Sequence, residues 1–253
     1  MSAPSSSARA RAALAGLAHG GPVPLALAHV LGEALLATAV DLGGMVRRWG
    51  ALLDGPDPIP DDLRPALESL QRRGVPPAAG AAEAGRGLAA HVVPIALLTH
   101  EVPANLLSGT VHVAALTHPG PEAAWSAVAL NVAMARLLQG YRDVVPDVSE
   151  ALRVNAAPSP LLDRVRRLPL TRQADLEPAS PDAAAALESA LWLAAREPLA
   201  ARGRAWLLEQ GAPPGTRAAA GALLGARTGD AGFPEAPDTA ALALRLGRLP
   251  ATP

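Results

Sequence analysis

Residues 122–138 read EAAWSAVALNVAMARLL and carry apolar side chains on almost every side of a helix. A helix that is apolar all round is typical of a position inside a protein rather than on its surface. Asn131 lies in the middle of this stretch, and a buried amide needs a hydrogen-bond partner. We therefore expect residues 122–138 to form a central, buried helix in which Asn131 is hydrogen-bonded.

The composition of the rest of the chain favours the same class of structure. Half of the 253 residues are apolar, but only four Trp, one Tyr and one Phe supply aromatic rings. Ala, Leu and Arg head the helix-propensity scale, whereas strong strand formers are few. The sequence predicts an all-α protein that is long enough to bury a real core.

Start and stop signals divide the chain into helices joined by short connections. Besides residues 122–138, we expect helices over residues 9–18, 24–40, 42–53, 63–73, 102–116, 182–196, 199–210 and 216–227. The mixture of Pro, Ser and charges over residues 155–181 is the only plausible boundary, but the helices after it are too few to form a core alone. We expect one compact domain over residues 9–248 with an irregular segment at 155–181, a flexible tail at 1–8 and a tail at 249–253.

Charge and cysteine content exclude several classes of function. The formal net charge is −1, which argues against a nucleic-acid partner, and the chain has no cysteine for disulfides, thiolate zinc sites or thiol catalysis. The most apolar stretch, residues 24–40, is about one membrane span long but contains His29 and Glu33. We expect no membrane span, no export signal and a cytoplasmic protein, and the use of Arg without Lys is typical of high-GC codon usage.

Adjacent or helix-spaced polar residues are the first candidates for chemistry. Asp61 and Asp62 follow a proline and precede an amphipathic run, so we favour a helix cap over a metal site. His29 and Glu33 stand one helical turn apart, and we favour an exposed contact between them over a metal site. The chain has no HxxxH, GxSxG, Walker loop or GxGxxG, and the near miss at residues 85–87 follows no strand.

Gly221 and Gly225 stand four residues apart in the run AGALLGA. Small residues at this spacing leave one helix face bare and allow another helix to approach closely. We interpret this pair as a packing feature and not as a site.

Several stretches, in chain order, resemble the ADP-ribosylglycohydrolase family, whose bacterial type member is the dinitrogenase reductase-activating glycohydrolase. Residues 9–21, RARAALAGLAHGG, resemble the opening helix GxLxGLAxGDALG, and residues 85–98 and 115–130, GRGLAAHVVPIALL and ALTHPGPEAAWSAVAL, resemble the family's NGAAMRVAPLGLL and LTHPHPEA. Residues 186–198 and 209–235 resemble the closing segment around GGDTDTIGAIAGALLGARYG. The resemblance implies an all-α fold, two magnesium ions and cleavage of ADP-ribose from protein side chains or related compounds.

The resemblance also shows where the chain departs from the family. The family's TDDT and DTDT motifs supply metal ligands, and their positions here are Gly21, Pro22, Val23 and Pro24 in the first case and Ala212, Pro213, Pro214 and Gly215 in the second. The arginine of the family's AMR motif falls at His91. Magnesium requires hard oxygen ligands, which Gly, Pro, Val and Ala side chains lack. We therefore expect no metal cofactor and a pseudoenzyme that has lost hydrolysis.

A pseudoenzyme of this family would act by binding either an ADP-ribose-type or other phosphate ligand, or a protein partner. The candidate binding residues are Gly85, Gly87, His91, His118 and Arg217. We expect two helix N-termini, near Pro24 and Gly215, to converge on the former active-site hollow. That hollow is either open to an anion, with Arg217 pointing inward, or plugged by Pro22, Val23, Pro213 and Pro214.

Two other functions stay open at this point. One is an active ADP-ribosyl hydrolase that uses displaced carboxylates, for which Asp41, Asp61 and Asp62 are the candidates. The other is a purely structural helical subunit of a larger assembly.

Overall fold

A computed structural model describes residues 3–37, 39, 41–78, 86–232 and 235–247. Within these residues all regular structure is helical, and the helices form one compact domain, as the composition predicts. The α-helices are α1 (Ser6–Gly16), α2 (Pro22–Leu36), α3 (Leu42–Gly50), α4 (Arg64–Arg73), α5 (Val93–Thr99), α6 (Pro103–Thr117), α7 (Pro121–Leu138), α8 (Val145–Val154), α9 (Ser159–Arg167), α10 (Ala183–Arg196), α11 (Ala200–Glu209), α12 (Pro214–Thr228) and α13 (Pro237–Leu246). Short 3-10 helices lie at η1 (Leu17–Gly20), η2 (Ala51–Asp54), η3 (Ala90–Val92), η4 (Leu168–Leu170) and η5 (Gln173–Asp175).

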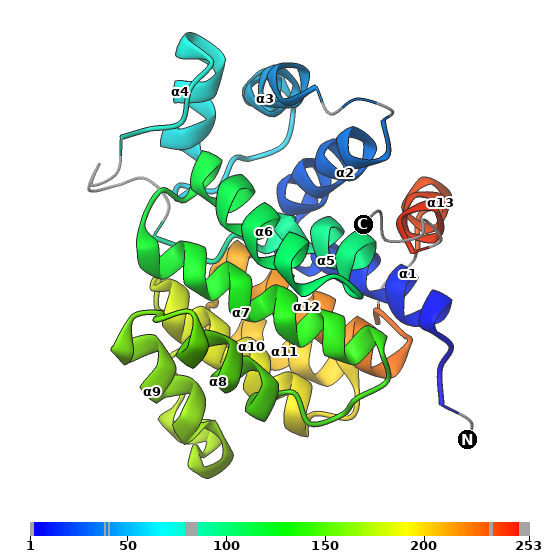
Figure 1. The fold of residues 1–253 in the computed structure, drawn as a ribbon, viewed down its shortest axis with the longest axis vertical. Coiled ribbons are helices and arrows are strands. Elements are labelled where there is room, and N and C mark those ends of the chain that lie inside the picture. The colour runs from blue at the N-terminus through cyan, green and yellow to red at the C-terminus, as the bar shows by residue number, and fades with distance from the viewer. Residues whose placement is uncertain (1–2, 38, 40, 79–85, 233–234, 248–253) are drawn as a thin grey trace.

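Helices α7 and α12 cross the middle of the molecule, with α3 and α4 at one end and α8 and α9 at the other (Figure 1). Helix α7 is buried along nearly its whole length, which confirms the central helix expected from its apolar sequence. The amide nitrogen of Asn131 donates to the carbonyl of Val92 at 3.1 Å and to the hydroxyl of Thr110 at 2.8 Å. The predicted hydrogen bonding of Asn131 is thus confirmed.

Helices α1 and α12 pack with their backbones in direct contact. A Cβ atom at Gly221 would overlap the carbonyl of Gly16, and one at Gly225 would overlap the carbonyl of Ala12. These overlaps confirm that the AGALLGA run serves close helix packing. Arg9, which is only 5% exposed, fastens the same helices to α7 by donating to the carbonyls of Leu137 and Ala226.

Helix α2 is tied to α13, the last helix, by polar contacts that the sequence assigned differently. His29 Nε2 lies 2.9 Å from the hydroxyl of Thr239, and Arg245 donates to Glu33 at 3.0 Å. Among the described residues, His29 and Glu33 share no hydrogen bond or ion pair. They interact only through charge, and each is hydrogen-bonded to a residue of α13.

The sequence located most helices but missed some and misplaced a cap. Helix α4 begins after Leu63 with no side-chain cap, so the expected capping by Asp61 or Asp62 is wrong. Pro94 lies in the first turn of α5, a position where a missing N–H costs little. Helix α1 begins at Ser6 inside the expected tail, α2 ends at Leu36, and α3 ends at Gly50, where a 3-10 helix follows. The sequence did not predict α5, α8, α9 and α13, and α9 lies inside the segment expected to be irregular.

In the part of the chain that the structure describes, no helix combines the length and apolar character needed to cross a membrane.

Candidate functional site

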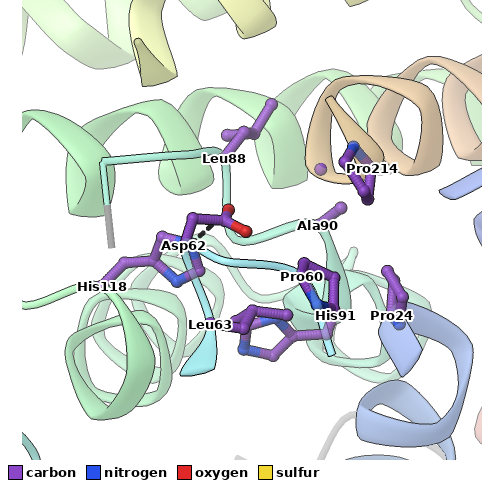
Figure 2. Close-up of a pocket in the computed structure, with 10 residues that line it drawn as sticks. Pro24, Pro60, Asp62, Leu63, Leu88, Ala90, His91, His118 and Pro214 are labelled. Atoms are coloured by element: carbon purple, nitrogen blue, oxygen red, sulfur yellow. Dashed lines mark ion pairs between the residues drawn. The ribbon is translucent and has the colours of Figure 1, made fainter. Parts of the chain in front are cut away.

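The N-terminal ends of α2 and α12 meet at one hollow, although about 190 residues separate them in sequence. Pro24 lines it from the first turn of α2 and Pro214 from the start of α12 (Figure 2). Gly215, the next residue of α12, lines it as well. The helix convergence expected from the sequence is therefore confirmed. The hollow's other walls come from the segment before α4, from η3 and the residues before it, and from the end of α6: Pro60, Asp62, Leu63, Leu88, Ala90, His91 and His118.

This inner hollow is almost filled by its own side chains. Its free volume is about 10 Å³, close to the minimum that a single water molecule needs. Of the residues expected to plug it, Pro214 lines it, whereas Pro22, Val23 and Pro213 do not; Leu63 and Leu88 are among the other apolar residues of its wall. The inner hollow is thus plugged, and it has no room for a sugar or a phosphate.

A chain of polar side chains runs from the protein interior to the hollow. The hydroxyl of Thr117 lies 3.1 Å from Nε2 of His91 and 2.8 Å from Nδ1 of His118. Nε2 of His118 in turn faces Oδ2 of Asp62 at 3.8 Å (Figure 2). In a consistent assignment of protons, His91 donates to Thr117, Thr117 donates to His118, and His118 directs its remaining N–H toward Asp62.

His91 lies in the protein interior at the end of this chain of polar side chains. His91 is 2% exposed and packs edge-on against Trp49, with ring centroids 5.2 Å apart. Burial, and then repulsion from His118, lower the pKa of His91 to about 3. His91 is therefore neutral at physiological pH and acts as an uncharged hydrogen-bonding group.

A second, larger hollow adjoins the first and opens toward the surface. It has a volume of about 260 Å³, and it shares Asp62, Leu88, Pro214 and Gly215 with the inner hollow. Its remaining walls are formed by Asp61, Gly87, Ser180, Pro181, Pro213 and Thr216. The only charged side chains among these lining residues are the two aspartates.

Two glycines allow the chain to close tightly around both hollows. A Cβ on Gly87 would overlap the carboxylate of Asp62, and a Cβ on Gly215 would lie 2.9 Å from the carbonyl of Leu88. The segment around Leu88 therefore rests on the first turn of α12 with no space between the two backbones.

The candidate binding residues occupy different places. His91 and His118 line the inner hollow and Gly87 lines the outer one, whereas Gly85 lies outside the described residues. Arg217 lines neither hollow. Burial, and then the positive charge of Arg204, lower the pKa of Arg217, which places its guanidinium beside another cation.

The residues at the hollow do not fit two magnesium ions. Pro24 and Pro214 offer no side-chain oxygen, and among the described residues Asp62 is the only carboxylate that lines the inner hollow. Two divalent ions need several carboxylate or other oxygen ligands each. Among the described residues, no group of three or more His, Cys, Asp or Glu side chains is arranged to hold a metal ion.

Thr117 is the polar residue of the site that the sequence analysis did not single out, and Asp62 was interpreted there mainly as a helix cap. Asp62 stands before a helix, where a cap is the usual role of an aspartate. Thr117 belongs to the quoted LTHPGPE stretch but attracted no assignment, since a threonine at a helix end is common. The signal that could have identified Thr117 is its position directly before His118, a candidate binding residue.

Comparisons with known proteins identify the family and the fold of the chain. Residues 24–245 match the family described as ADP-ribosylglycohydrolase. A solved structure named "ADP-ribosylglycohydrolase-related protein complex" superposes with a TM-score of 0.76 at 22% identity, covering 96% of this chain and 98% of that chain, which shows a shared fold. A search among curated proteins gives no match.

Proposed function

The chain belongs to the ADP-ribosylglycohydrolase family, and we propose that it is a member that has lost hydrolysis and acts by binding a protein partner. The observation that carries the proposal is the inner hollow between α2 and α12. Its free volume is about 10 Å³, and Asp62 is its only carboxylate in the part of the chain that the structure describes. A site without space for a substrate, and without ligands for the metals that activate water, has no means of family catalysis.

The displaced carboxylates do not restore a reaction centre. Asp41 caps α3 by accepting from the backbone N–H of Gly44. Asp61 lines only the outer hollow, and Asp62 faces His118. Glycosidic hydrolysis by carboxylates uses two of them on opposite sides of the scissile bond. Asp61 and Asp62 are neighbours in the chain and line the same outer hollow, where they do not provide that arrangement.

An ADP-ribose ligand is disfavoured by size and charge. The outer hollow measures about 260 Å³, below the roughly 300–1,000 Å³ of typical small-molecule pockets. Its charged lining residues, Asp61 and Asp62, repel a diphosphate. A protein partner does not need an enclosed pocket, and the solved neighbour named as a complex is a precedent for such a role on this fold.

Two measurements on the unmodified protein test the proposal. With magnesium present, we expect no release of ADP-ribose from an ADP-ribosylated protein substrate. In a thermal-shift series with ADP-ribose, AMP and phosphate we expect no change of Tm. A ligand at a hundred times its Kd would add about 2.7 kcal/mol and raise Tm by a few degrees. Release of ADP-ribose would establish an enzyme, and a shift with ADP-ribose alone would establish a nucleotide-binding module instead.

A further inference from the structure

A third hollow lies beside the C-terminal end of α9, away from the two described above. It has a volume of about 440 Å³ and shares no lining residue with the inner or the outer hollow. Helix α9 lies at the end of the molecule opposite α3 and α4 (Figure 1). We call it the α9 hollow, and its lining residues are Arg164, Arg167, Leu170, Thr171, Asp175, Glu177 and Glu188.

Leu170, which lines the α9 hollow, is both exposed and firmly held. It is 85% exposed, more than any other large apolar residue in the described part of the chain. On one side of it, Arg196 donates to the carbonyl of Pro169 at 2.6 Å. On the other side, the indole N–H of Trp192 donates to the carbonyl of Thr171 at 2.9 Å. Because this turn is already ordered, burying Leu170 against another molecule requires little further loss of conformational entropy.

The charges of the α9 hollow are balanced at its buried side but not at its rim. At the buried side, Arg164 donates to the carboxylate of Glu188 at 2.8 Å, so the two charges offset each other. At the rim, Arg167 is exposed and makes no side-chain hydrogen bond or ion pair with any described residue. The side chain of Glu177 is 63% exposed, and its one ion pair among those residues is a 3.5 Å contact with Arg164. The rim therefore presents one cation and one carboxylate to solvent.

A projecting apolar side chain, a hollow and charges of both signs on one surface fit a second copy of the same chain. In a two-fold symmetric dimer a patch faces itself, so a residue of one copy meets a different residue of the other. Leu170 supplies an apolar centre for such an interface, and Arg167 and Glu177 supply its polar rim. A partner of one charge sign would place a like charge against one of these two residues, whereas a second copy matches both. The formal net charge of −1 adds little repulsion between copies.

We propose that the α9 hollow is the centre of a two-fold symmetric interface between two copies of this chain. Leu170 of each copy enters the hollow of the other, and Arg167 of each copy pairs with Glu177 of the other. The inference goes beyond the proposed function, because it concerns a second copy of the chain and not a different protein. The dimer leaves the inner and outer hollows uncovered by the α9 hollow, since they share no lining residue with it.

Analytical ultracentrifugation of the full chain, from micromolar to millimolar concentration, tests for this dimer. We expect a reversible equilibrium between monomer and dimer in the unmodified protein. Leu170→Glu places a charge in the apolar centre and should raise the dimer Kd at least about tenfold. The matched control Leu42→Glu makes the same change at an exposed leucine of α3 and should leave the Kd unchanged. A monomer at every concentration, or the same Kd for all three proteins, overturns the inference.

Two charge-reversal variants test the symmetric pairing itself. In a dimer of Arg167→Glu two carboxylates meet at both contacts, and in a dimer of Glu177→Arg two guanidinium groups do, so each variant should raise the Kd at least about tenfold. In an equal mixture, both contacts of the mixed dimer join opposite charges, and we expect its Kd to return to within about threefold of the unmodified value. A role of either residue within its own copy gives no such recovery, so a mixture that stays as weak as the single variants overturns the inference. The proposed function fails separately, through ADP-ribose release or a nucleotide thermal shift in the unmodified protein.

Discussion

The middle and the beginning of α12 differ in what their sequence retains. In the middle, Gly221 and Gly225 contact the backbone of α1 so closely that any Cβ would overlap a carbonyl. At the beginning, Pro214 and Gly215 line a hollow of about 10 Å³, and the family resemblance assigns Pro214 to the position of a metal-binding aspartate. One helix thus keeps the features that build the fold and lacks those that would bind metal. The fold depends on close contact between helix backbones, whereas the family's reaction depends on side-chain oxygens. A chain can therefore keep the fold without the side chains that the reaction needs.

The largest expected effect comes from a single methyl group at the α1–α12 contact. Gly225→Ala places a Cβ against the Ala12 carbonyl, and overpacking against backbone, which cannot rotate away, should lower the free energy of unfolding by more than about 3 kcal/mol. The control Gly43→Ala lies on the exposed start of α3 and should gain up to about 1 kcal/mol. Urea unfolding measures both, and similar values for the two variants would contradict the close packing.

A second effect arises from the buried histidine behind the hollow. The pKa of His91 is lowered to about 3, so between pH 6.5 and 3 the unfolded chain binds a proton that the folded chain does not. Stability should therefore fall as pH falls through this window, by about 1.4 kcal/mol per pH unit from this residue. His91→Leu should flatten the slope by that amount, whereas His112→Leu at an exposed position on α6 should not. An unchanged slope in His91→Leu would show that His91 is protonated in the folded protein.

A smaller effect is expected at the first turn of α12. Pro214→Ala removes a ring from the inner hollow but leaves the helix start intact, so the loss should stay below about 1 kcal/mol. The same urea series then compares Pro214 directly with Gly225. A loss at Pro214 as large as that of Gly225→Ala would mean that the plug, and not the α1–α12 contact, holds this helix in place.

The smallest effect is expected from a variant designed to restore hydrolysis. Ala212→Asp combined with Pro214→Asp returns two carboxylates to the α12 side but none to the start of α2. Because a coordination shell must be complete before catalysis begins, we expect no ADP-ribose release from a modified protein substrate. Measurable turnover by this double variant would show that the ligand positions are assigned wrongly.

The sequence predicted the structure well where a residue pattern has one usual structural role. The apolar run around Asn131 predicted the central helix, and the spacing of Gly221 and Gly225 predicted a close helix contact. It was less informative for short polar segments, because their partners lie far away in the chain. Asp62 turned toward His118 rather than capping α4, a pairing set by tertiary packing that no local pattern encodes.

Calorimetric titration of the unmodified protein with Mg²⁺ and with Mn²⁺ tests the central claim most directly. As far as the structure describes the chain, the hollow between α2 and α12 receives no side-chain oxygen from either helix start, and Asp62 is its one carboxylate. We therefore predict no saturable heat and no rise of Tm with either ion. A two-site isotherm of micromolar affinity would contradict the account, because it would require a dinuclear centre that these residues cannot form.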